Sequence, residues 1–152
     1  FGGPNHVRIT QEALLVLMDT RGDPLERLRN GIQVSTTPGF VEKNPDFIDE
    51  WVAYRVAHPI DPTAYEAQLA IGLALMSEDA CFEHRLAQIE APTLIMFGAC
   101  DKVVPPGNAR LLAQQIPDSK VSILPGVGHF YPFEAPEMAV TAVTRFLRSY
   151  NC

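Results

Sequence analysis

Two short apolar segments in the second half of the chain constrain the fold most strongly. The first, residues 93–97, lies between Pro92 and Gly98, and the second, residues 121–124, stops at Pro125. The first segment does not alternate polar with apolar side chains, which is typical of a strand covered on both faces of a parallel sheet, and we expect the second strand to be buried in the same way. A helical pattern follows each of them. The order strand, helix, strand, helix therefore predicts a parallel pair joined by a right-handed crossover.

A pair of strands raises a physical difficulty. Three or more strands are normally needed for a stable sheet, and this chain offers few helices to cover both faces. The sequence begins with Phe1 rather than Met. We therefore expect further strands to come from a missing N-terminal segment or from another copy of the chain. Either source implies an exposed apolar surface on the chain alone, and hence an oligomer.

Residues 1–90 have the character of a helical unit that begins with a loop over residues 1–9. Residue pairs 23–24, 44–45 and 61–62 each place Asp or Asn before Pro, which is typical of an N-cap followed by the first helical position. The third of these predicted helices has the clearest apolar stripe, made of Tyr65, Leu69, Leu73 and Met76. No alternating strand pattern occurs here. We place the boundary near residue 91, with residues 91–152 forming the strand–helix unit.

Composition excludes several classes of function. A net charge of -6 and a pI of about 5.1 disfavour nucleic acid as a partner. No apolar run approaches the roughly 18 residues that span a bilayer. Three cysteines at irregular spacing predict neither a disulfide framework nor a zinc site, and they favour a reducing, cytoplasmic compartment. His6, His58 and His84 form no metal-ligand spacing, so we expect no metal.

The loops after the two predicted strands carry the chemistry. Asp101 follows the first strand and His129 follows the second, 28 residues later. The carboxyl ends of parallel strands meet at one edge of a sheet, where functional groups collect. An imidazole oriented by a buried carboxylate is the base of a nucleophile–histidine–acid triad. Asp101 and His129 are therefore the candidate acid and base.

Simpler interpretations exist for each of these residues. Asp101 alone would be a turn-capping aspartate, and His129 alone an ordinary polar loop residue. Cys100 is a conceivable thiol nucleophile, but adjacent side chains point apart, which favours a small loop residue. Trp51 is more typical of core packing than of a substrate pocket. We nevertheless keep Trp51 and Phe130, which follows the histidine, as weak pocket candidates.

Several segments together resemble the last third of the α/β-hydrolase fold. They are Ala91-Pro92-Thr93-Leu94-Ile95, Gly98-Ala99-Cys100-Asp101, Val104-Pro105, Leu124-Pro125-Gly126 and Gly128-His129. In that family the order is nucleophile, acid, histidine, and Asp101 and His129 match the last two. Residues 1–4 resemble the loop that leaves its sixth strand. The resemblance implies an α/β fold in which a helical cap, residues 1–90, precedes the C-terminal strand–helix units of the core, the N-terminal strands being absent.

The sequence departs from the family at the nucleophile. The elbow motif G-x-S-x-G occurs nowhere, and none of the five serines has glycines at that spacing. The His-Gly oxyanion motif is also missing. The resemblance thus implies a fragment that supplies the acid and the histidine, and that we expect to be inactive alone. The whole enzyme would hydrolyse an ester, lactone or carbon–carbon bond of a small apolar substrate, or transfer its acyl group, without a cofactor.

Two alternatives remain open at this point. A haloalkane dehalogenase or epoxide hydrolase would use an aspartate nucleophile at the same elbow, and the missing part alone decides between the two. A non-enzymatic, self-associating module is the alternative from another class. In each case the expected partner is a second copy of the chain or a complementing N-terminal half.

Overall fold

The structure is a computed structural model that describes residues 2–75 and 81–150. Phe1, Met76 and Cys152 lie outside the described residues. The first part of the chain is helical, and its elements are α1 (Gln11–Met18), α2 (Pro24–Ser35), α3 (Phe40–Lys43), α4 (Pro45–Ala57), α5 (Pro62–Ala74) and the 3-10 helix η1 (Glu83–Gln88). The second part consists of β1 (Thr93–Gly98), α6 (Gly107–Gln115), β2 (Ser119–Leu124), α7 (Tyr131–Glu134) and α8 (Pro136–Arg148).

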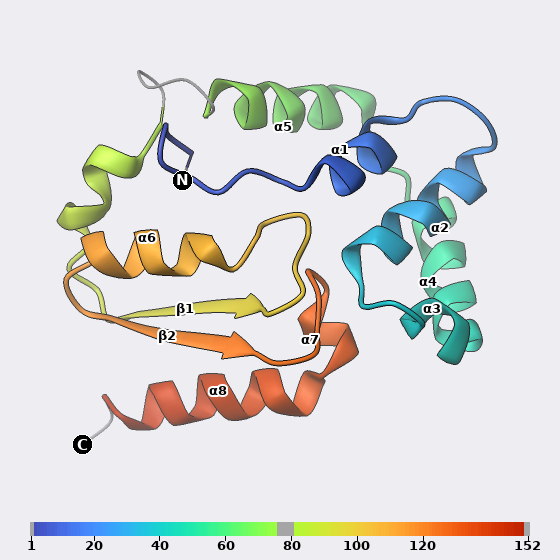
Figure 1. The fold of residues 1–152 in the computed structure, drawn as a ribbon. Coiled ribbons are helices and arrows are strands. Elements are labelled where there is room, and N and C mark those ends of the chain that lie inside the picture. The colour runs from blue at the N-terminus through green and yellow to red at the C-terminus, as the bar shows by residue number, and fades with distance from the viewer. Residues whose placement is uncertain (1, 76–80, 151–152) are drawn as a thin grey trace.

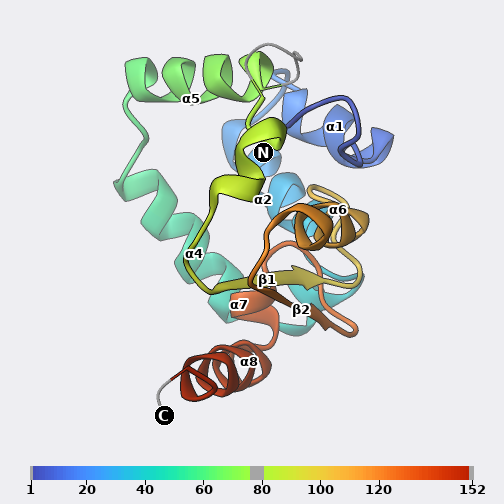
Figure 2. The same cartoon turned by 90° about the vertical axis from the view of Figure 1, so that its left-hand side faces the viewer.

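The two predicted strands form, and they pair in parallel. Thr93 lies opposite Ser119, and Gly98 lies opposite Leu124. The strands are slightly longer than the apolar runs, because β1 includes Gly98 and β2 begins at Ser119. Figures 1 and 2 show α6 and α8 on opposite sides of this pair, and Figure 1 shows α2, α3 and α4 beyond the carboxyl ends of the strands. Helices α2, α3 and α4 therefore lie beyond the edge where the sequence places the functional loops.

Each part of the chain has its own small core. In the second part, Ile95 of β1 packs with Ala109 and Ile116 of the α6 segment, and Leu86 of η1 joins them. In the helical part, Ile32 of α2 packs with buried residues of α4. Burial of an aliphatic side chain stabilises by roughly 1.5–3 kcal/mol, so each cluster holds its neighbouring elements together.

The Asp-Pro pairs act as predicted, but the Asn-Pro pair does not. Asp23 accepts hydrogen bonds from the N–H groups of Leu25 and Glu26, and Asp61 accepts one from Ala64. Asn44 makes no side-chain cap for α4. Its Nδ2 instead donates to the Phe40 carbonyl at 2.7 Å, because Asn44 also ends α3 and serves the orphan carbonyls there.

Much apolar surface lies uncovered. Val121 and Ile123 of β2 are 47% and 41% exposed, so this chain does not cover both strand faces by itself, as its small number of helices led us to expect. On α8, Val140 is 64% exposed and Leu147 is 53% exposed. The stripe on α5 is also exposed where the structure describes it, at Tyr65, Leu69 and Leu73. The exposed apolar surface expected from the sequence is therefore present.

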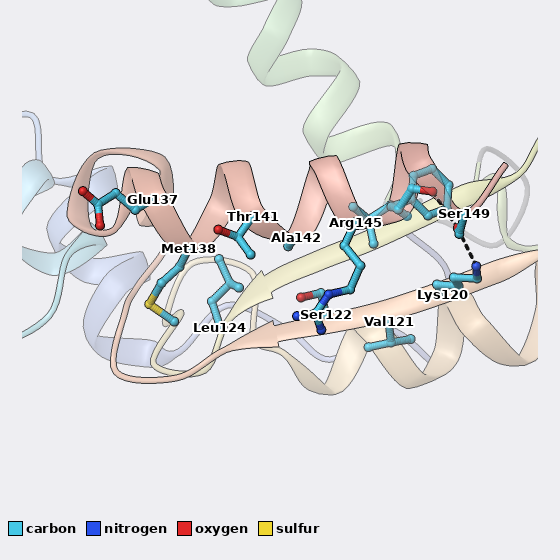
Figure 3. A pocket seen from close by; sticks show the side chains of 12 residues that line it. Lys120, Val121, Ser122, Leu124, Glu137, Met138, Thr141, Ala142, Arg145 and Ser149 are labelled. Carbon is cyan, nitrogen blue, oxygen red and sulfur yellow. Dashed lines mark hydrogen bonds between the residues drawn. The ribbon is translucent and has the colours of Figure 1, made fainter. Parts of the chain in front are cut away.

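A groove of about 600 Å³ runs between α8 and the strands (Figure 3). Lys120 and Ser149 face each other across it, with a hydrogen bond of 2.7 Å from Nζ to Oγ. Its lining comes from β1, β2 and α8, and neither Asp101 nor His129 belongs to it. In the part of the chain that the structure describes, no helix combines the length and the apolar character needed to cross a membrane.

The ends of the two strands interlock through backbone contacts. The N–H of Ala99 donates to the Leu124 carbonyl at 2.8 Å, and the N–H of Cys100 donates to the Val127 carbonyl at 2.9 Å. A Cβ on Gly98 would lie 2.1 Å from the Gly128 oxygen and 2.5 Å from the Val127 oxygen. Only a residue without a side chain fits there. The loop after β1 is thereby fixed against the loop after β2.

We expect Gly98→Ala to destabilise the chain by about 1–3 kcal/mol, because the new methyl group meets backbone atoms that cannot move away. Thermal or urea unfolding followed by circular dichroism measures this. Gly72→Ala is the matched control, since a Cβ there meets nothing within 4 Å and lies inside α5. Alanine should be neutral or stabilising by about 0.5–1 kcal/mol at that position. Equal stability of the two variants would contradict the interlock.

Candidate active site

Asp101 and His129 meet at the edge where the strands end. Nδ1 of His129 lies 2.9 Å from Oδ2 of Asp101, at hydrogen-bond distance. The Asp101 side chain is 3% exposed, whereas the His129 side chain is 34% exposed. An ionised carboxylate can only accept hydrogen bonds, so the neutral imidazole donates from Nδ1. The pair therefore combines a buried, oriented acceptor with a ring that solvent or another molecule can reach.

The second carboxylate oxygen of Asp101 is also occupied. Oδ1 accepts the backbone N–H groups of Val103 and Val104, both at 2.8 Å. The turn-capping role that the sequence offered as a simpler interpretation is therefore present as well. These two bonds hold the carboxylate plane, which leaves Oδ2 for the imidazole. Such an arrangement fixes the ring orientation and stabilises an imidazolium.

Nε2 of His129 makes no hydrogen bond to any residue that the structure describes. With the proton on Nδ1, Nε2 is the basic nitrogen of the ring. A base that is oriented through one nitrogen and open at the other can take a proton from an incoming group and return it later. The geometry thus suits general acid–base chemistry.

Trp51 and Phe130, the two weak pocket candidates, lie together. Their ring centroids are 4.9 Å apart in an edge-to-face arrangement, and the Phe130 ring lies 5.5 Å from that of His129. Both aromatic residues line a cavity of about 520 Å³ in the helical part. The volume is in the range of small-molecule sites. Its other walls come mainly from α1, α2, α4 and α5, and they include Val16, Leu17, Leu28, Ile32, Tyr65, Arg27 and Arg55.

One carboxylate at this cavity, that of Asp19, has its negative charge balanced by a neighbouring arginine. Asp19 lines the cavity and forms an ion pair with Arg21, with Nε and Oδ1 2.9 Å apart. The side-chain hydrogen bond from Arg21, aided by the Arg21 backbone N–H, lowers the pKa of Asp19 to about 2. Asp19 is therefore ionised at neutral pH and stays paired. Arg27 and Arg55 contribute two positive groups to the same lining.

The remaining candidates lie outside this arrangement. Cys100 is exposed, and no hydrogen bond of its thiol occurs among the described residues. His58 stacks on Tyr54, and its Nδ1 lies 2.9 Å from the Tyr54 carbonyl oxygen. Within residues 2–75 and 81–150, no group of three or more His, Cys, Asp or Glu residues is placed to hold a metal ion.

Sequence reasoning missed Glu134. Its Oε1 accepts the N–H of Gly128, the residue before His129, at 2.7 Å. The sequence offers a weak signal: a carboxylate five residues after the histidine, followed by Ala135 and Pro136. Nothing in that spacing indicates which backbone groups it would bind.

Comparisons with known proteins identify the family and the fold of the chain. The family model described as alpha/beta hydrolase fold matches residues 12–136. The chain is 37% identical over 67 residues to 2-hydroxy-6-oxononadienedioate/2-hydroxy-6-oxononatrienedioate hydrolase 2 of Pseudomonas putida, covering 44% of this chain and 23% of that protein. It is 34% identical over 64 residues to the rhodomycin D methylesterase DauP of Streptomyces sp. strain C5, covering 42% of this chain and 22% of that protein.

A solved structure shares the fold over nearly the whole chain. The meta-cleavage product hydrolase CumD of Pseudomonas fluorescens IP01 superposes with a TM-score of 0.63 at 18% identity, covering 95% of this chain and 52% of that one. The chain thus spans about half the length of this solved relative, and under a quarter of each of the two curated relatives named above is aligned. The chain belongs to the α/β hydrolase fold family.

We expect Asp101→Asn to switch the tautomer of neutral His129. The amide oxygen can keep the bonds from Val103 and Val104, while the amide NH₂ presents a donor to Nδ1 and moves the proton to Nε2. Two-bond ¹H–¹⁵N NMR correlations of the ring measure the tautomer directly. The His58 ring is the internal control, since its Nδ1 contacts a backbone carbonyl instead. If His129 kept its proton on Nδ1 in Asp101→Asn, the result would contradict the hydrogen bond between Asp101 and His129.

Proposed function

We propose that this chain supplies the acid and the base of a hydrolase active site, with Asp101 orienting and His129 transferring protons. The substrate class is a small ester, a lactone or an activated carbon–carbon bond. The observation that carries the proposal is the 2.9 Å contact between the buried Asp101 carboxylate and His129, at the ends of two adjacent parallel strands. The names of two curated relatives, a rhodomycin D methylesterase and a 2-hydroxy-6-oxononadienedioate hydrolase, support hydrolysis of a small substrate.

The proposed reaction needs a nucleophile from outside this chain. Nε2 of His129 takes the proton of that nucleophile as it attacks the scissile carbonyl carbon, and Asp101 stabilises the imidazolium that forms. The imidazolium then gives the proton to the leaving group as its bond to carbon breaks. In the second half, Nε2 activates water, which releases the acid and restores the nucleophile. This chemistry requires no cofactor, and acyl transfer differs only in the acceptor that replaces water.

We also propose that residues 1–90 are the cap of the enzyme and residues 91–152 the C-terminal part of its core. The cavity lined by Trp51 and Phe130 supports this division, because it lies in the helical part and reaches the residue after His129. Its mainly apolar wall suits the acyl portion of a small substrate. The strands that would carry the nucleophile and the oxyanion donors belong, in this proposal, to a preceding segment.

The direct test is hydrolysis of a short-chain p-nitrophenyl ester by the 152-residue chain and by the chain joined to an upstream hydrolase half. We expect turnover only in the joined form, because the chain has no nucleophile elbow. His129→Ala should then lower the rate by about 10²-fold or more, and His58→Ala should leave it unchanged. Turnover by the short chain that disappeared in Cys100→Ser would overturn the proposed absence of a nucleophile.

A further proposal concerns the uncovered apolar surface. The exposed side chains on β2 and α8 would be covered by further strands and helices, from a preceding segment or from a second copy. We expect the chain alone to elute above its monomer mass of 16.8 kDa in size-exclusion chromatography with light scattering. Val140→Lys combined with Leu147→Lys should reduce that mass, whereas Gln114→Lys, an exposed polar position on α6, should not. A monomer at all concentrations would contradict this proposal.

A further inference from the structure

Glu134 connects the histidine loop to the helical part through both of its carboxylate oxygens. Oε1 accepts the N–H of Gly128 at 2.7 Å. Oε2 accepts the N–H of Thr37 at 2.7 Å and the hydroxyl of Thr37 at 2.5 Å. Thr37 follows the end of α2, and Glu134 ends α7, so the carboxylate joins segments that are 97 residues apart. Hydrogen bonds to an ionised acceptor are about twice as strong as neutral ones.

The other side of His129 is held to the same segment. The N–H of Phe130 donates to the Ser35 carbonyl at 3.1 Å. A Cβ on Gly128 would lie 2.9 Å from the Ser35 oxygen and 3.1 Å from Oε1 of Glu134, so the loop packs tightly there. The residues immediately before and after His129 are thus both bound, directly or through Glu134, to residues 35–37.

Residues 35–37 are themselves well anchored. Ser35 and Thr36 are buried, and their hydroxyls donate to the carbonyls of Gly31 and Ile32 on the last turn of α2. Ser35 also lines the cavity that contains Trp51 and Phe130. The same short segment therefore touches the cavity, carries the bonds to Glu134 and supports the loop of the base.

We propose that Glu134 is a positioning residue for His129. Its carboxylate clamps the His129 loop onto the end of α2, and this clamp keeps Nδ1 within hydrogen-bond reach of the Asp101 carboxylate. The inference rests on the proposed function of Asp101 and His129 as acid and base. Loss of the clamp frees the loop on the side of Gly128, so the ring spends less time paired with Asp101 and the Nδ1 proton exchanges with water more often.

The test is ¹⁵N NMR of the His129 ring in the full chain. In Glu134→Ala we expect about tenfold faster exchange of the Nδ1 proton with water and a mixture of ring tautomers. Glu134→Gln should be intermediate, because its amide oxygen still accepts one of the bonds. Thr37→Val removes only the hydroxyl bond and leaves the charge of Glu134 in place, and it should shift the exchange rate in the same direction by less.

Thr63→Val is the matched control, because it makes the same chemical change at an exposed position on α5, away from Glu134 and from residues 35–37. Its ring spectrum should match the wild type. If Glu134→Ala fails to fold, Thr37→Val and Glu134→Gln carry the test. Unchanged exchange and tautomer in those variants, with Asp101→Asn still switching the tautomer, would overturn the role of Glu134 alone. An unchanged tautomer in Asp101→Asn would overturn the underlying acid–base pair instead.

Discussion

The close approach of Gly98 to the backbone of Val127 and Gly128 determines how the candidate site is built. A Cβ at Gly98 would overlap carbonyl oxygens of both residues, so the loop after β1 can touch the loop after β2 only through a glycine. Because the two loops touch, the carboxylate of Asp101 reaches the imidazole of His129 across the gap between neighbouring strands. The pairing of acid and base thus depends first on a backbone contact and only then on the side chains.

The helical part of the chain supports both loops from the other side. The N–H of Thr10 donates to the carbonyl of Lys102, and the Lys102 side chain forms an ion pair with Glu12 at 2.9 Å. These contacts hold the residue that follows Asp101 to the start of α1. The His129 loop is held to the end of α2 through Glu134 and Ser35. The exposed ion pair between Lys102 and Glu12 contributes little to folding stability by itself. The backbone and carboxylate contacts determine where each loop lies.

The sequence predicted the parts of the structure that local patterns specify. The two apolar runs became parallel strands, and Asp101 and His129 met because the carboxyl ends of such strands share an edge. Asn44 shows the limit of a local pattern, since the end of α3 took its side chain away from α4. Glu134 could not be predicted, because its partner Thr37 lies 97 residues away and binds through a backbone N–H as well as its hydroxyl. The exposed side chains of β2 agree with the expectation that this chain has too few helices to cover both strand faces.

We propose that His129 is an oriented base for a nucleophile supplied by a preceding segment. A crystal structure of the chain joined to an upstream hydrolase half would give the distance from His129 Nε2 to the side-chain atom of the nucleophile. We expect this distance to be about 2.6–3.2 Å, with the Asp101 contact to Nδ1 retained. A His129 ring turned away from the nucleophile, or bound through Nε2 to another group, would contradict it.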